Sequence, residues 1–215
     1  MSDKKRTILD LGALQLKTKP LEGSNRPASL AVKTWGNRVS VAVYTGLDSL
    51  PRKGIIGLNM HPLEFAMVLG MLEELTEIPY SEAESTKIAR KMKVYNKAGG
   101  KDKELYGECV VGRDQQGIYY ICIIATDNAF PKVVFRLLPP RSVEIEGDLE
   151  SYKISRIFTR AWIDFYRTLM PIHIMDNFAD ESNGSSTWKG KSGGNNNSGG
   201  SSNNSSNYDE DDIPF

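Results

Sequence analysis

The chain has little cysteine and histidine for its 215 residues, and it has no long apolar run. Its cysteines are Cys109 and Cys122, and its histidines are His61 and His173. Neither pair has the spacing of metal ligands, so no metal site is expected. No apolar segment has the length of a membrane span, and no signal-peptide pattern opens the chain. We therefore expect a cytoplasmic protein with reduced thiols and no membrane partner.

The sequence also lacks a recognisable catalytic constellation. No nucleophile and base, paired carboxylates or metal ligands occur at a familiar spacing. Gly190-Lys191-Ser192 matches the end of a phosphate-binding loop, but Ser185 stands where that loop needs a glycine. We therefore expect a protein that is not an enzyme and binds no cofactor.

The formal net charge of zero conceals an uneven distribution of charge. Residues 176–215 contain seven acidic residues and two lysines, a net charge of −5, which leaves +5 for residues 1–175. From about Asn183 onward, apolar residues give way to Gly, Ser and Asn runs typical of a flexible linker. A basic body with an acidic tail suits a polyanion-binding protein whose tail competes for the same surface.

The last eight residues, 208–215, have the composition of a docking peptide. A run of like charge stays solvated and gives no stability to a fold. Here the acids precede an apolar end, where proline limits the ordering entropy and the terminal ring can enter a pocket. The acids add attraction to a basic rim. The predicted partner-binding residues are Asp209, Glu210, Asp211, Asp212, Ile213, Pro214 and Phe215.

This ending resembles the acidic tip of bacterial and bacteriophage single-stranded DNA-binding proteins, in which a disordered linker precedes an Ile-Pro-Phe-type peptide. The resemblance covers residues 208–215 and the character of the linker before them. It implies a protein that coats and protects single-stranded DNA during DNA replication, recombination and repair. It also implies that the tip recruits replication and recombination proteins. A phage-encoded member would act in the cytoplasm of the host cell.

The resulting domain organisation has three parts. Residues 1–178 are expected to form the single-stranded DNA-binding domain, residues 179–207 a disordered linker and residues 208–215 the partner-binding tip. The sequence is compatible with a homo-oligomer. The alternative function is a protein–protein adaptor with incidental affinity for nucleic acid.

Two β-rich runs between Leu30 and Thr45 surround Gly36-Asn37, a strong signal for a two-residue hairpin turn. This turn places Trp35 opposite Arg38. One face is then apolar, and the other combines cations with aromatic rings, as binding to single-stranded nucleic acid requires. The alternative is that Trp35 packs at a domain edge. The predicted DNA-binding residues on this face are Lys33, Trp35, Arg38 and Tyr44.

A second basic stripe lies in the alternating segment 87–97. A solvated edge strand also uses lysine, so this stripe alone leaves both interpretations open. The strand predicted at 132–138 carries two further cations. The predicted DNA-binding residues of these segments are Lys91, Lys93, Tyr95 and Lys97, with Lys132 and Arg136 as weaker candidates.

The segments 105–112 and 118–125 predict another hairpin. A two-residue loop at Gln115-Gln116 would place Cys109 opposite Cys122. A disulfide would then be geometrically conceivable, but a reducing compartment disfavours it, and both thiols are expected to pack as small core residues.

Two helices complete the expected fold. One starts near Pro62, with His61 as a cap or surface residue, and ends at Pro79. The other spans residues 152–170 and stops at Pro171. Trp162 on this helix is expected in the core, with a stacking role as the alternative. A first strand is expected within 7–17, and residues 18–28 are expected to form a loop.

The fold class is therefore α+β, mainly antiparallel β with two helices. The order ββββα occurs twice and resembles the Whirly-type fold of transcriptional coactivators and some phage single-stranded DNA-binding proteins. The alternative is an oligonucleotide-binding β-barrel with an added C-terminal helix.

Overall fold

The computed structural model describes residues 15–35, 37–81, 87–96, 104–140 and 142–176. The chain divides into two units, Met1–Ala179 and Asp180–Phe215. The described residues belong to the first unit and form an α+β fold with two antiparallel sheets. The predicted linker and acidic tip lie outside the described residues.

The first sheet, which we call sheet A, has its four strands in chain order. In β2 and β3 the register places Trp35 opposite Arg38 and Leu30 opposite Val43, so the predicted first hairpin is confirmed. The apolar face of this hairpin is buried, as at Val32 and Val41. The strands are β1 (Leu16–Pro20), β2 (Pro27–Trp35), β3 (Arg38–Tyr44) and β4 (Ile55–Met60).

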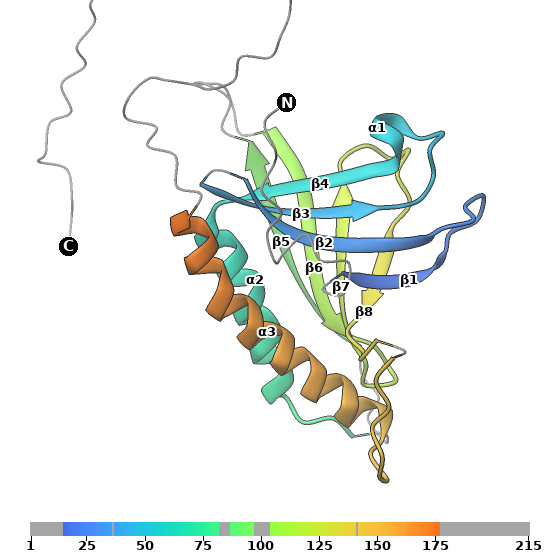
Figure 1. The fold of residues 1–215 in the computed structure, drawn as a ribbon, viewed down its shortest axis with the longest axis vertical. Coiled ribbons are helices and arrows are strands. Elements are labelled where there is room, and N and C mark those ends of the chain that lie inside the picture. Colours follow the sequence, from blue (N-terminus) through green and yellow to red (C-terminus); the bar gives the residue numbers. More distant parts are fainter. Residues whose placement is uncertain (1–14, 36, 82–86, 97–103, 141, 177–215) are drawn as a thin grey trace, which may run out of the picture. The chain divides into compact units, whose positions relative to one another are not determined.

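The second sheet, sheet B, repeats the chain-order arrangement. Neither sheet is closed by pairing of its described edge strands, so the described residues do not form the barrel of the alternative prediction. The strands of the two sheets run in crossing directions (Figure 1). The strands of sheet B are β5 (Ile88–Asn96), β6 (Glu104–Arg113), β7 (Tyr119–Ala125) and β8 (Val133–Arg136).

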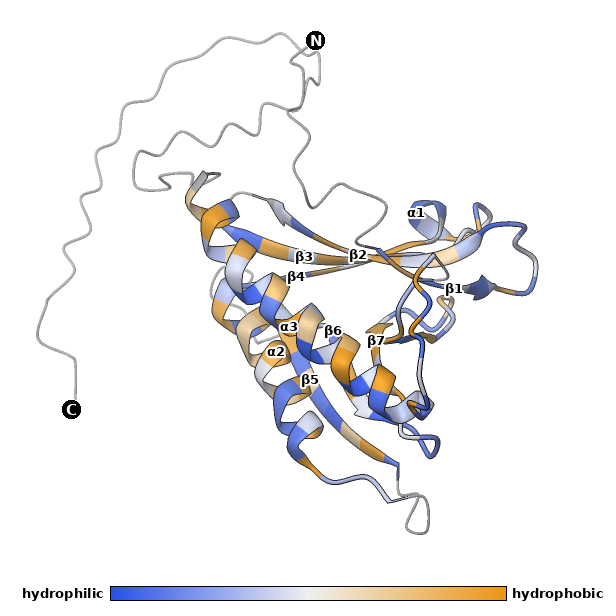
Figure 2. Cartoon of the chain, turned by 60° about the horizontal axis from the view of Figure 1, so that its bottom comes forward, coloured by the Kyte–Doolittle hydropathy of each residue, from blue (hydrophilic) through white to orange (hydrophobic). Residues whose placement is uncertain are grey.

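One long helix follows each sheet, α2 (Pro62–Glu77) after sheet A and α3 (Ser151–Asp176) after sheet B. The two helices lie side by side (Figure 1), joined by Arg167, which donates two hydrogen bonds to the Glu73 carboxylate. Hydrophobic and hydrophilic residues alternate along α3 (Figure 2), as expected for an amphipathic helix. The apolar sides of both helices and both sheets share one core.

The start of α2 confirms the cap predicted for His61. Its Nδ1 accepts a hydrogen bond from the Leu63 N–H at 3.3 Å. The Glu64 carboxylate accepts the His61 N–H at 2.7 Å, which completes a capping box. Pro62 occupies the first helical position, where its missing N–H costs nothing.

The predicted end of the second helix is wrong, because α3 continues through Pro171 to Asp176. A proline within a helix removes one N–H donor, which is why the sequence predicts a break there. Met170, next to the proline, is buried in the core, and Ile174 packs against the same cluster. Tertiary packing therefore carries the helix past the lost hydrogen bond.

The predicted start of sheet A is also wrong in part. Residues 18–20 belong to β1, and Pro27 opens β2, whereas the sequence predicts a loop over residues 18–28. Leu16 is buried opposite Leu30, and this single apolar anchor holds the short edge strand against β2. Residues 7–14, the rest of the predicted first strand, lie outside the described residues.

The predicted register of the second hairpin is wrong by one residue. Cys109 pairs with Ile123, and Cys122 pairs with Val110. The turn between Arg113 and Tyr119 is longer than two residues: the Asp114 N–H donates to the Ile118 carbonyl at 2.9 Å. Because side chains alternate along a strand, this shift moves every β7 side chain to the face opposite the predicted one.

A short turn, α1 (Pro51–Gly54), connects β3 to β4. Its Arg52 and Lys53 have φ values of 51° and 54°, so it is a left-handed turn and not a regular helix. The Thr45 hydroxyl donates to the Gly54 carbonyl at 2.8 Å and closes the turn.

No helix in the described part of the chain is both long and apolar enough to cross a membrane.

Candidate nucleic-acid interface

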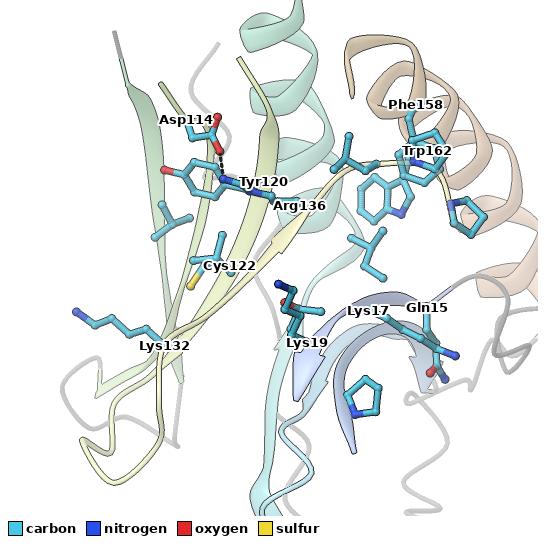
Figure 3. Close-up of a pocket in the computed structure, with 18 of the residues that line it drawn as sticks. Gln15, Lys17, Lys19, Asp114, Tyr120, Cys122, Lys132, Arg136, Phe158 and Trp162 are labelled. Carbon is cyan, nitrogen blue, oxygen red and sulfur yellow. Dashed lines mark ion pairs between the residues drawn. The ribbon is translucent and has the colours of Figure 1, made fainter. Parts of the chain in front are cut away.

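A large cleft lies where β1, the edge of sheet A, meets β8, the edge of sheet B. Its volume is about 1670 Å³, well above the roughly 300–1,000 Å³ of most small-molecule sites. Three structural elements supply its walls: β1, the face of sheet B that points away from the core, and α3 (Figure 3). Its size suits an extended ligand.

Cations predominate among the charged side chains of the cleft. β1 contributes Lys17 and Lys19, and β8 with the residue before it contributes Lys132 and Arg136 (Figure 3). Lys87 precedes β5 at another part of the wall. Asp114 is the one acidic residue among the described residues that line the cleft. An anionic polymer would therefore meet a net positive lining.

Apolar side chains lie between these cations on sheet B. Val134 stands between Lys132 and Arg136 on β8 and is 47% exposed. Cys122 and Tyr120 share its face on β7, because Cys122 pairs with Val134 and Tyr120 with Arg136. The resulting surface alternates charge with apolar area, the combination that phosphates and unstacked bases require.

Tyr120 lies flat on the sheet above a glycine. A Cβ atom on Gly112, its partner on β6, would come within 2.5 Å of the Tyr120 ring carbon Cζ and of its hydroxyl. Any larger residue at position 112 would push the ring out of this position. Tyr120 is 7% exposed, so it contributes to the floor of the cleft. Burial raises the pKa of its hydroxyl.

Arg136 is held by the turn between β6 and β7. Its Nη2 lies 2.9 Å from Asp114 Oδ2 and donates to Gln116 Oε1 at 3.1 Å (Figure 3). The other oxygen of the same carboxylate accepts the Gln116 and Ile118 N–H groups at 3.0 and 2.9 Å. Asp114 therefore both shapes the turn and offsets part of the charge of Arg136.

The predicted cations of β5 lie on the same face of sheet B as the cleft. Lys91 pairs with Val110, and Lys93 with Glu108. The Lys91 ammonium forms an ion pair of 3.0 Å with Glu108, so the charge of Lys91 is partly neutralised and attracts an anionic ligand less strongly. Lys93 is exposed and has no ion-pair partner among the described residues. Tyr95 is 44% exposed, beyond a register shift after Val94.

Among the predicted residues of sheet A, the three with described side chains, Lys33, Arg38 and Tyr44, do not line the cleft. Lys33 and Tyr44 lean together on the outer face of the hairpin, with the ammonium 5.6 Å from the ring centroid. Arg38 is exposed at the start of β3. The backbone of Trp35 lies opposite Arg38, but its side chain is outside the described part, as is all of Lys97. Lys132 and Arg136, the weaker candidates, are the predicted DNA-binding residues that line the cleft.

The sequence interpretation missed several residues of the cleft. Lys17 falls at the end of the predicted first strand and Lys19 in the predicted loop, but both belong to β1 and line the cleft. The predicted register places Tyr120 and Cys122 on the wrong face of β7. Neither signal points to a cleft, because β1 and β8 are far apart in the chain.

The two cysteines face opposite sides of sheet B, so the register excludes a disulfide between them. Burial, together with the nearby Cys122, raises the pKa of Cys109 to about 12. Burial also raises the pKa of Cys122, while Lys132 opposes this change. Cys109 is a core thiol as predicted, whereas Cys122 is buried in the floor of the cleft, and its predicted core position is wrong. Neither thiol has the lowered pKa of a reactive cysteine.

Among the described residues, no group of three or more His, Cys, Asp or Glu side chains is placed to hold a metal ion.

Comparisons of the chain with protein-family models, curated protein sequences and solved structures return no match. The cleft and its lining are therefore the basis for a functional assignment.

Proposed function

We propose that the chain is a non-catalytic protein that binds single-stranded DNA, protects it during replication and recombination, and recruits partner proteins through its acidic tip. The observation that carries this proposal is the cleft between β1 and β8. An apolar floor lies among four cations, Lys17, Lys19, Lys132 and Arg136. Asp114, the one acidic residue among the described lining residues, is paired with Arg136.

The chemistry of the cleft favours a single strand. Single-stranded nucleic acid offers phosphates and unstacked bases along the same path, so its binding site needs cations and apolar or aromatic area close together. Lys132, Val134 and Arg136 supply this alternation along one strand. Contacts of this kind tolerate any sequence, as a coating protein requires.

The order of the elements gives further support. Four antiparallel strands and a long helix occur twice, and the strands of the two sheets cross (Figure 1). This arrangement resembles the Whirly-type fold, in which antiparallel sheets expose a face to DNA. The likeness concerns the arrangement of elements alone.

The tip gives the proposal its second half. Residues 208–215 end in Asp-Asp-Ile-Pro-Phe, as in single-stranded DNA-binding proteins that recruit partners. The four carboxylates are complementary to the cations of the body, so the tip competes with DNA until the strand displaces it.

A titration with labelled oligo-dT at two salt concentrations tests the binding function. Binding that weakens steeply with salt supports the proposal, because phosphate contacts release counterions. Weak binding without a salt slope would instead favour the protein–protein adaptor. Parallel titrations of Trp35→Ala and Lys132→Gln distinguish the outer face of sheet A from the cleft. The variant whose substitution lies on the DNA-binding surface should bind oligo-dT more weakly than the wild type.

A further inference from the structure

One part of the cleft is lined by aromatic side chains, for which binding of phosphates by the cations gives no role. Its wall is α3, which contributes Phe158, Trp162 and Phe165 on successive turns. Trp162 projects from the helix toward the space between α3 and the sheets (Figure 3). Its ring centroid lies 4.6 Å from that of Tyr166, so the indole is fixed in position by the core behind it.

Trp162 carries a hydrogen-bond donor that is not used within the described part of the chain. The side chain is 7% exposed, and its Nε1 is buried without a hydrogen-bond partner there. A buried donor left unpaired destabilises a fold by about 1–3 kcal/mol, and buried polar groups are paired in most proteins. A phenylalanine would fill the same wall without this cost.

We infer that the α3 wall is a base-binding subsite of the cleft, in which one unstacked base packs against Phe158 and Trp162 and accepts a hydrogen bond from Trp162 Nε1. This inference rests on the proposed function. Phe158 and Phe165 line the same wall and are only partly buried, so we assign to movement of these rings the opening through which the base reaches the buried nitrogen. The cost of the unpaired donor in the free protein is then recovered on binding.

The surroundings of Trp162 suit a base better than a phosphate. The α3 side of the cleft is apolar, whereas Lys17 and Lys19 lie across the cleft on β1. A strand in the cleft can therefore place its phosphates on β1 and turn one base toward α3. Every base has a ring-nitrogen or carbonyl acceptor, so an indole N–H selects a base without selecting a sequence.

The indole N–H signals of the full-length, ¹⁵N-labelled protein report this contact directly. The chain has three tryptophans, and loss of one signal in Trp162→Phe identifies that of Trp162. We expect the Trp162 signal to move downfield when oligo-dT binds, because a new hydrogen bond deshields the proton. An abasic oligomer of equal length should leave it unchanged.

Binding titrations give the second readout. Trp162→Phe keeps an aromatic wall but removes the donor, so its affinity for oligo-dT should fall about three- to tenfold. Its affinity for the abasic oligomer should equal that of the wild type, which also shows that the variant is folded. Trp188→Phe, outside the described residues, is the matched control and should bind both oligomers normally.

Two results would overturn the subsite. One is oligo-dT binding that leaves the Trp162 indole signal in place. The other is an equal loss of affinity for both oligomers in Trp162→Phe. Failure of the proposed function looks different, because the wild type would then bind neither oligomer.

Discussion

Arg136 on β8 is joined to Asp114 in the β6–β7 turn by an ion pair of 2.9 Å at the edge of the cleft. The Asp114 side chain is only 21% exposed, whereas that of Arg136 is 52% exposed. The Asp114 carboxylate therefore occupies one side of the Arg136 guanidinium, which under the proposed function binds a DNA phosphate.

Asp114→Asn should strengthen binding to oligo-dT. The amide oxygen can still accept the Gln116 and Ile118 N–H groups that shape the turn, while the negative charge is lost. We expect a two- to fivefold rise in affinity at low salt, since exposed ion pairs are worth up to about 1 kcal/mol. Glu74→Gln removes the partner of Arg90 on the other face of β5 and should leave affinity unchanged. Weaker binding by Asp114→Asn would show that the pair positions Arg136 for DNA.

Lys132→Gln should lower both the affinity for oligo-dT and its dependence on salt. One lost phosphate contact reduces the slope of log affinity against log salt by about 1. Lys153→Gln is the control, because Lys153 is exposed on α3 and paired with Glu150 at 2.6 Å. Fluorescence anisotropy at four or more salt concentrations gives both slopes. Equal slopes for Lys132→Gln and the wild type would remove β8 from the proposed interface.

Deletion of residues 208–215 should leave DNA binding intact or tighten it, while capture of replication or recombination proteins is lost. The tip carries four of the acids that oppose the basic body, so its removal relieves competition for the cations. Binding titrations and pull-downs with full-length and truncated protein measure the two effects. A clear loss of DNA affinity in the truncated protein would contradict this competition.

Ser155→Ala should destabilise the fold by about 1–3 kcal/mol, because it leaves buried polar groups unpaired. The Ser155 hydroxyl accepts the Tyr119 N–H at 3.0 Å and donates to the Leu137 carbonyl at 2.8 Å, which ties α3 to sheet B. Thr168→Ala removes an exposed hydroxyl from the same helix and is the control. Urea unfolding measures both variants, and equal midpoints would show that water replaces Ser155.

Stability should fall as the pH rises from about 9 toward 12. The pKa of Cys109 is raised from 9.0 to about 12 in the folded chain, so the unfolded chain loses that proton first. The stabilisation is complete below the unfolded pKa and disappears as the pH approaches the folded one. Thermal unfolding across this range should decline less steeply in Cys109→Ala. Identical pH profiles would show that Cys109 is not the group responsible, and Tyr166, whose pKa burial also raises, would be tested next.

Some parts of the fold could be predicted because their signals are local. Gly36-Asn37 predicts a two-residue turn, and a turn of known length sets the register of β2 and β3. His61 and Pro62 predict the start of α2 by the same short-range logic. The apolar period of α3 indicated a core position for Trp162, which is buried.

The cleft could not be predicted, because it depends on contacts between distant segments. The turn around Asp114 could close with two residues or more, and that choice decided which face Tyr120 occupies. Pro171 predicts a break that core packing on both sides of it overrides.

The sequence by itself determined the local elements, the segregation of charge and the acidic tip, since each depends on residues close together in the chain. Only the tertiary structure decided that β1 meets β8, and that Lys17 and Lys19 therefore lie across a cleft from Trp162. The physical reason is that sheet packing brings together edges more than a hundred residues apart, and no local pattern records which edges will meet.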